Sequence, residues 1–241
     1  MSNSTTWSHA PASPSLQSGE IHVWRVDLEQ PEEVVQQFRS TLEDDELNRA
    51  DRFHFDKDRR AFTVSRGFLR HVLGRYTATK PEALRFSYGP YGKPSLDQND
   101  SSLRFNMSHS RGVGLVAVSE AKELGVDVEY IRADFASEDI ARRFFSANEV
   151  AAFNALPIQQ RVAAFFRCWT RKEAYIKAIG RGLSQALDGF DVTLAPEAPP
   201  ALLRADEDDA SRWWLSDIDV GSDYAAALVV EGQLSSVRCW Q

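Results

Sequence analysis

One order of predicted elements occurs twice along this chain, and this repeat restricts the possible folds more than any other feature. Apolar patterns typical of strands and of an amphipathic helix give the order strand, helix, strand, strand in each half. The first half has predicted strands at 20–28, 84–89 and 112–119 and a predicted helix at 59–76. The second half has predicted strands at 124–131, 190–195, 212–218 and 223–230 and a predicted helix at 165–180. The repeat predicts an α+β fold, a pseudo-dimer of two similar β-α-β-β halves with the active site in a cleft at their junction. An accidental match is the alternative, since this order is common.

The boundaries of the two halves follow from composition. Residues 1–19 are rich in Ser, Thr and Pro and have almost no apolar periodicity, so they are predicted to form a mobile tail. The N-terminal half is then 20–121 and the C-terminal half 122–241. Within the C-terminal half, Ser146 with Glu149 three residues later predicts a helix start, and Pro157 predicts its end.

Composition excludes several classes of protein. The 241 residues are 43% hydrophobic, enough for a real core, and the net charge of −7 with a pI of about 5.3 disfavours nucleic acid and anionic lipid as general partners. Cys168 and Cys239 are too few for a disulfide framework. There is no run long enough to span a membrane and no signal pattern. We expect a cytoplasmic, monomeric protein that binds neither nucleic acid nor membrane.

Two carboxylates lie within the apolar stretch LGVDVEYI at 124–131. On a strand, Asp127 and Glu129 project from the same face roughly 6.5 to 7 Å apart, whereas Val126 and Val128 point the other way. Burying such charges costs several kcal/mol unless a cation compensates, so the pair could share one cation. The alternative is an antiparallel strand with one face in water.

A second pattern in the predicted helix 165–180 adds to this one. Phe165, Trp169, Glu173 and Lys177 recur every four residues and form one stripe that begins aromatic and becomes charged. Glu173 is interpreted as a third carboxylate facing the strand pair, with Lys177 one turn further on to neutralise an anion. A solvated Glu173–Lys177 pair is the alternative.

Three carboxylates around one site suit Mg²⁺, with Mn²⁺ as a substitute, because hard divalent ions prefer oxygen ligands and often share phosphate oxygens with a substrate. Zinc is disfavoured, since the chain has no HExxH motif and its five histidines are scattered.

Basic residues that could hold phosphates gather in the first half: Arg49, Arg52, Arg59, Arg60, Arg66 and Arg70. Salt bridges to neighbouring acidic residues are the alternative and suit most of them. Lys93 lies in the turn GPYGKPS, which is not a P-loop. Ser108, His109 and Ser110 are predicted to form a polar, anion-binding loop before an apolar strand; a Ser-His hydrolase is disfavoured because no GxSxG elbow is present.

Together these segments resemble the Sfp-type 4′-phosphopantetheinyl transferases. The matching pieces are GKP (92–94), FNMSHS (105–110), LGVDVEYI (124–131), RRFFSANE (142–149) and WTRKEAYIKAIGRGL (169–183). The resemblance implies the pseudo-dimer fold already predicted. It also implies transfer of the phosphopantetheine arm of coenzyme A to a serine of an acyl or peptidyl carrier protein, with release of 3′,5′-ADP.

The resemblance also implies roles for individual residues. Asp127, Glu129 and Glu173 would bind Mg²⁺ on the pyrophosphate of coenzyme A. Glu173, directly or through water, would take the proton of the carrier serine, and Lys177 would stabilise charge on the phosphates. The residues implied to bind coenzyme A are Lys93, Ser108, His109 and, near the nucleotide, Arg49 and Arg60.

Two other functions compete with this one. A Mg²⁺-dependent nuclease also uses carboxylates and a lysine around a phosphate, but its carboxylate-x-lysine pattern is missing. A non-catalytic module binding coenzyme A or a carrier protein would have no use for three converging carboxylates. The sequence does not tell whether the carrier serves fatty-acid, polyketide or peptide synthesis. Carrier contact is expected around Phe144, Phe145 and the following helix.

Overall fold

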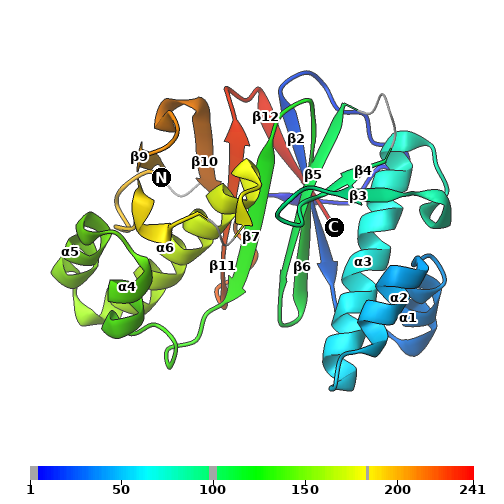
Figure 1. Cartoon of the computed structure of the whole chain (residues 1–241), viewed down its shortest axis with the longest axis horizontal. Coiled ribbons are helices and arrows are strands. Elements are labelled where there is room, and N and C mark those ends of the chain that lie inside the picture. The colour runs from blue at the N-terminus through cyan, green and yellow to red at the C-terminus, as the bar shows by residue number, and fades with distance from the viewer. Residues whose placement is uncertain (1–4, 98–101, 183–184) are drawn as a thin grey trace.

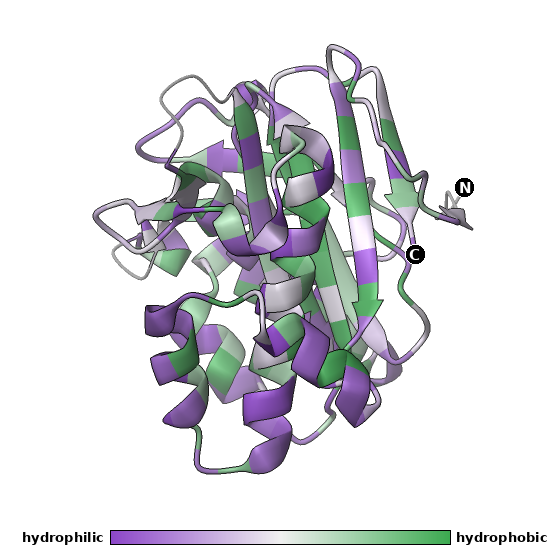
Figure 2. Ribbon diagram, turned by 90° about the vertical axis from the view of Figure 1, so that its right-hand side faces the viewer, coloured by the Kyte–Doolittle hydropathy of each residue, from purple (hydrophilic) through white to green (hydrophobic). Residues whose placement is uncertain are grey.

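The computed structural model describes residues 5–97, 102–182 and 185–241. Two sheets, one mixed and one antiparallel, lie side by side in the middle of the molecule, and one long helix covers the outer side of each (Figure 1). The two halves and the α+β class predicted from the repeat are confirmed. Figure 2 shows that hydrophobic residues concentrate in the strands, while the outer turns of the helices are hydrophilic.

The N-terminal half is built on the long helix α3 (Asp56–Thr77). Its other helices are α1 (Glu32–Arg39) and α2 (Asp44–Asp51) and the 3₁₀ turn η1 (Pro81–Ala83). Its strands are β2 (Glu20–Asp27), β3 (Phe86–Tyr88), β4 (Pro94–Leu96), β5 (Leu103–Ser110) and β6 (Val113–Glu120). Helix α3 ends at Ala78 in the left-handed conformation, a common way to stop a helix.

The C-terminal half is built on the equally long helix α6 (Ile158–Ile179). Its other helices are α4 (Glu138–Phe144) and α5 (Ala147–Ala155) and the 3₁₀ turns η3 (Leu187–Gly189) and η4 (Ala210–Arg212). Its strands are β7 (Leu124–Tyr130), β8 (Phe190–Val192), β9 (Leu202–Ala205), β10 (Trp213–Asp217) and β11 (Tyr224–Glu231), followed by β12 (Ser236–Trp240). Ser146 and Glu149 form the predicted capping box at the start of α5, and Pro157 separates α5 from α6.

The strand order places β5 and β7 at facing edges. The larger sheet has the order β1-β12-β2-β6-β5, where β1 is Trp7–Ser8, and the smaller has the order β10-β11-β7. Buried residues of both sheets form one shared apolar cluster, which includes Val126 and Val128 of β7 and Leu115 of β6, all 0% exposed. Because the valines point into this cluster, Asp127 and Glu129 are left on the opposite face of β7, as the alternation predicts.

Gly125 lets helix α6 approach β7 closely. A Cβ atom at this position would overlap the carbonyl oxygen of Ala174 and the amide nitrogen of Ala178. Only a residue without a side chain fits there. The close approach brings the middle of α6, with Glu173 and Lys177, over the carboxylate face of β7.

Several predicted boundaries differ from the structure. In the segment 1–19, Trp7–Ser8 form strand β1, which pairs with Cys239 and Trp240 of β12, and the Trp7 indole donates to the Asp219 carbonyl at 2.8 Å. The described part of the expected tail therefore packs against the sheet, because its tryptophan has an apolar body and a donor to satisfy. Residues 1–4 lie outside the described part.

Strand pairing also corrects the assignment of segments to halves. Strand β12 lies in the predicted C-terminal half but pairs with β2 in the larger sheet. The predicted strand at 84–89 is shortened to β3, which pairs only with β4 in a separate ribbon. The predicted polar loop at 105–112 is wrong, since residues up to Ser110 belong to β5. The side chains of Ser108 and Ser110 bond to carboxylates of β7 across the junction.

Candidate functional site at the junction of the two halves

Polar side chains of β5 join the two sheets where their edges face each other. Asn106, Ser108 and Ser110 alternate along β5 and so share a face. Their bonds to β7 are Val126 N to Asn106 Oδ1 (3.0 Å), Ser108 Oγ to Asp127 Oδ1 (2.8 Å), Ser110 Oγ to Glu129 Oε2 (2.9 Å) and Tyr130 N to Ser110 Oγ (3.1 Å). This row of bonds, which we call the seam, fixes β7 and its carboxylates against the N-terminal half.

Asp127 is the most deeply buried carboxylate of the seam, with 3% of its surface exposed. Lys177 Nζ lies 2.6 Å from Asp127 Oδ1 and also donates to Ser108 Oγ at 2.9 Å. The second oxygen, Asp127 Oδ2, is buried without a hydrogen-bond partner among the described residues. A buried carboxylate oxygen with no donor is costly, so the site is suited to a cation at this atom.

The negative charge of Asp127 acts on both Glu129 and Glu173. Burial, and then the charge of Asp127, raise the pKa of Glu129, while Ser110 and Lys177 oppose the shift. Burial and the charge of Asp127 likewise raise the pKa of Glu173, against the effect of Lys177. The predicted three carboxylates and Lys177 are thus close enough to interact.

The side chains of Asp127, Glu129 and Glu173 are not arranged around one metal position in this structure. Within 5–97, 102–182 and 185–241, no group of three or more His, Cys, Asp or Glu side chains has the arrangement of a formed metal site. The metal-binding role of Asp127, Glu129 and Glu173 stays a prediction. The unpartnered oxygen of Asp127 and the raised pKa values of the two glutamates nevertheless fit a hard divalent cation.

Two clefts open beside the seam. One, of about 530 Å³, is lined by Glu173 and Lys177 and by apolar groups that include Phe144 and Ile176. The other, of about 1150 Å³, lies at the far end of β5; its lining includes Lys57, Arg60, His109, Ser110 and Arg111. The first is largely apolar beside the carboxylates, and the second is lined by charged residues of both signs, among them Lys57, Arg60 and Arg111 and the acidic Glu29, Asp56 and Asp58.

Lys93 reaches the junction, but its ammonium group is already bound. Its Nζ lies 2.7 Å from Glu123 Oε2, 2.8 Å from the Ala178 carbonyl and 3.3 Å from the Leu124 carbonyl. In this structure Lys93 ties the end of α6 to the start of β7. The predicted contact with phosphate is untested. Lys93 does line the smaller cleft.

His109 and Arg60 both lie on the wall of the larger cleft, and their contact with coenzyme A stays a prediction. Desolvation in the cleft lowers the pKa of His109, and the charges of Lys177 and Arg49 lower it further. Arg60 pairs with Glu32 and donates to the Gln30 carbonyl at 2.9 Å. The Arg49 guanidinium lies over the Phe62 ring, 5.2 Å from its centroid.

Other arginines of the first half have structural partners, as the salt-bridge alternative predicts. Arg66 and Arg70 are buried and both bind Glu46, through Nε at 2.7 Å in each case. Arg70 also donates to Glu43 at 2.7 Å. This network attaches α2 to α3.

A buried ion pair links two of the sequence motifs. Lys172 of WTRKEAYIKAIGRGL is 1% exposed, and its Nζ lies 2.6 and 2.7 Å from the carboxylate oxygens of Glu149 of RRFFSANE. Glu149 also accepts from the Val192 amide at 2.8 Å. The pair holds α5 against α6, a structural role for residues next to the site. Leu183, the last residue of the longer motif, lies outside the described residues.

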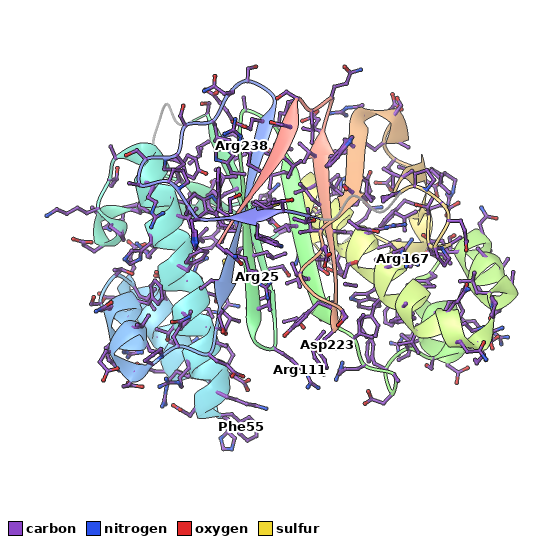
Figure 3. All side chains as sticks on the ribbon, turned by 180° about the vertical axis from the view of Figure 1, so that it is seen from behind. Arg25, Phe55, Arg111, Arg167, Asp223 and Arg238 are labelled. Carbon is purple, nitrogen blue, oxygen red and sulfur yellow. The ribbon has the colours of Figure 1, made fainter. Side chains whose placement is uncertain are left out.

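Sequence reasoning missed two residues of the junction. The sequence predicts Ser110 only as part of an anion-binding loop, whereas in the structure its hydroxyl bonds to Glu129. Arg111 follows β5 at the turn seen in Figure 3, with φ of 49° and its guanidinium 4.0 Å from the Tyr130 ring centroid. The alternation of Asn106, Ser108 and Ser110 was the available signal for a strand with one polar face.

Comparisons with known proteins show the family to which the chain belongs. A family model described as "4′-phosphopantetheinyl transferase superfamily" matches residues 123–229, and one described as "4′-phosphopantetheinyl transferase, N-terminal" matches 29–121. The transferase HetI of Nostoc is 40% identical over 94% of this chain and 94% of its own length. The transferase Sfp of Bacillus subtilis is 29% identical over 72% of this chain and 77% of its own length.

Solved structures are more distant. The ACPS–CoA complex described from Chronobacterium ammoniagenes is 21% identical, with a TM-score of 0.36, and the match covers 47% of this chain and 99% of that one. The assignment therefore rests on the sequence relatives and the family models. The chain belongs to the 4′-phosphopantetheinyl transferase family.

Proposed function

We propose that the seam and its two clefts form the active site for transfer of the 4′-phosphopantetheine arm of coenzyme A to a serine of an acyl or peptidyl carrier protein. The carrier serine Oγ bonds to the phosphorus that bears the pantetheine arm. The bond from that phosphorus to the bridging oxygen breaks, and 3′,5′-ADP leaves with that oxygen. The observation that carries this assignment of the site is the buried, unpartnered Asp127 Oδ2 beside Glu129, Glu173 and Lys177.

Asp127, Glu129 and Glu173 would hold Mg²⁺ or Mn²⁺. When bound, the ion would neutralise charge on the pyrophosphate of coenzyme A. The oxygen-only donor set and the buried Asp127 Oδ2, which has no hydrogen-bond partner among the described residues, support this choice. The relatives named above are transferases, which disfavours the nuclease alternative.

Glu173 and Lys177 supply what the reaction needs from side chains. Glu173, directly or through water, accepts the proton of the carrier serine. Lys177 Nζ, held beside Asp127, stabilises negative charge on the phosphates as the bridging bond breaks. Both lie on the rigid helix α6, which keeps their positions fixed during the reaction.

The clefts suggest how the substrates lie. We place the nucleotide end of coenzyme A in the larger cleft, where His109 and Arg60 line the wall and Arg49 is near enough to affect His109. Ser108 approaches the phosphates from the seam, and Lys93 approaches them from the smaller cleft. The carrier meets the opening of the smaller cleft at Phe144. Phe145, also expected at the carrier contact, is only 3% exposed and packs in the core of the C-terminal half, so that expectation is corrected.

Other expectations stay predictions. No helix in the part of the chain that the structure describes combines the length and the apolar character needed to cross a bilayer. A monomer, a cytoplasmic location, the absence of nucleic-acid binding and a carrier from fatty-acid, polyketide or peptide synthesis are proposals. Sedimentation would test the first of these, and a dimer would contradict it.

The decisive experiment is the intact mass of an apo carrier protein after incubation with coenzyme A, Mg²⁺ and the protein. We expect a gain of one phosphopantetheine that disappears with a chelator and with Asp127→Ala. No gain with several carrier types, despite binding of coenzyme A, would instead favour a binding module. A gain that persists in the Asp127→Ala variant would reject the site.

A further inference from the structure

Ser110, at the end of β5, contacts two groups of β7 at once. Its Oγ lies 2.9 Å from Glu129 Oε2 and accepts from the Tyr130 amide at 3.1 Å. We propose that Ser110 is a positioning residue that fixes the Glu129 carboxylate for binding of the divalent cation. The inference rests on the proposed function, because it assumes that Glu129 is a metal ligand.

The two contacts of Ser110 define the direction of its hydroxyl hydrogen. A hydroxyl has one donor hydrogen and two acceptor lone pairs. The Tyr130 amide can only donate, so it occupies a lone pair of Oγ. The hydroxyl hydrogen is then directed to Glu129 Oε2, which can only accept when the carboxylate is charged. The amide of the next residue on β7 thus orients the donor that holds the carboxylate.

Glu129 depends on Ser110 more than Asp127 depends on Ser108. Asp127 Oδ1 is bound both by Ser108 and by Lys177, so losing one donor leaves the other. Among the described residues, Ser110 Oγ is the only hydrogen-bond donor to the Glu129 side chain. Glutamate has a long, flexible side chain, and Asp127 on the same face repels it. Without Ser110, the Glu129 carboxylate would lose its fixed orientation.

Groups that orient a metal ligand affect metal affinity without touching the metal. Loss of such a partner typically weakens metal binding or activity by about 10- to 100-fold. Ser110 holds Oε2 and leaves Oε1 of Glu129 without a hydrogen bond in the described structure. The expected consequence of removing the hydroxyl is a weaker metal site with the rest of the site intact.

The test measures Mn²⁺ binding to the full chain in the presence of coenzyme A, from the electron paramagnetic resonance signal of free aqueous Mn²⁺. Ser110→Ala is expected to weaken Mn²⁺ binding by about 10-fold or more, and Ser110→Thr, which keeps the hydroxyl, by less than about 3-fold. Ser119→Ala is the matched control, because Ser119 is a buried serine on β6 whose Oγ donates to the Lys122 carbonyl at 2.6 Å. It should bind Mn²⁺ as the wild type does.

Carrier modification supplies the kinetic readout. In Ser110→Ala, the Mn²⁺ concentration for half-maximal rate should rise in step with the loss of affinity, while the rate at saturating Mn²⁺ stays within about 3-fold. If circular dichroism shows that Ser110→Ala does not fold, Ser110→Cys replaces it, since the thiol has a similar size and is a weak donor.

The inference is overturned if the wild type binds Mn²⁺ and Ser110→Ala binds it equally well; the proposed function would then survive. A wild type that modifies the carrier at full rate with a chelator present would overturn the metal role of Glu129 and this inference with it. Equal loss of affinity in Ser110→Ala and Ser119→Ala would also overturn it, because a general effect on the sheets would then explain the result.

Discussion

Lys177 Nζ lies 2.6 Å from Asp127 Oδ1 and joins the helix of one half to the strand that borders the other. Asp127 is buried, whereas 27% of the Lys177 side chain is exposed. The lysine therefore compensates a carboxylate that water does not reach, and it remains open to a ligand in the cleft. This pair therefore contributes both to the stability of the fold and to the chemistry of the site.

Removing the lysine should destabilise the protein as well as inactivate it. Lys177→Met leaves a charged, buried Asp127, and we expect the free energy of unfolding to fall by about 2 kcal/mol, less than for a fully buried pair. Urea denaturation without metal measures this. Adding Asp127→Asn should restore at least half of the loss while carrier modification stays abolished. No recovery in the double variant would contradict the assigned pairing.

The two raised glutamate pKa values predict that the site costs stability at neutral pH. A folded-state pKa above 4.5 means that the native protein binds more protons than the unfolded chain in the window above that value, so stability falls as pH rises through the window. Glu173→Gln should therefore raise the melting temperature at pH 7 in chelator, and lower turnover by about 100-fold or more. Exposed Glu33→Gln is the control. A lower melting temperature in Glu173→Gln would refute the reasoning.

Gly125 should not tolerate a methyl group. Gly125→Ala would press on the backbone of α6 at Ala174 and Ala178, and we expect a loss of about 1 to 3 kcal/mol from overpacking. Carrier modification should fall too, because α6 bears Glu173 and Lys177. Gly89→Ala is the matched control, since its Cβ would meet only the Lys93 carbonyl, at 3.6 Å. If the two variants had equal urea midpoints, the close approach of α6 would not restrict the residue that fits at position 125.

Arg60 should affect the binding of coenzyme A and not the rate of the chemical step. Loss of a charge-assisted hydrogen bond to phosphate predicts a KM for coenzyme A raised by about 10-fold or more in Arg60→Ala, with kcat nearly unchanged. Its neighbour Arg59, exposed and paired with Asp56, does not line the larger cleft, so Arg59→Ala should leave KM unchanged. Steady-state rates of carrier modification separate the two. Similar KM values in both variants would indicate that the nucleotide end of coenzyme A does not bind in this cleft.

The carboxylates of the site could be predicted from the sequence because their spacing is local. Asp127 and Glu129 follow from the two-residue period of a strand, and Glu173 and Lys177 follow from one turn of a helix. Buried Val126 and Val128 fix which face of β7 is apolar, so this part of the prediction needed no knowledge of distant contacts.

The partners of these residues could not be predicted in the same way. Ser108, His109 and Ser110 look like a loop because they are polar, and only the facing strand β7 gives their hydroxyls something to bond. Lys93 binds Glu123 and the carbonyl groups of Leu124 and Ala178, partners on other elements that the turn GPYGKPS does not reveal. The partner of a strand is set by tertiary packing, so a pattern within one strand does not reveal it.

Strand β12 has a consequence for how the chain is made. It lies between β1 and β2, and Ser236 Oγ donates to Glu20, 216 residues earlier. While the ribosome is still translating the C-terminal half, β2 lacks one of its two neighbours and exposes an open edge. The larger sheet can therefore be completed only after residues 236–240 have left the exit tunnel, and such a distant pairing is slow to form. Strand β2 is thus synthesised early but gains its second neighbour only at the end, and a nascent chain stalled before β12 should be prone to aggregate.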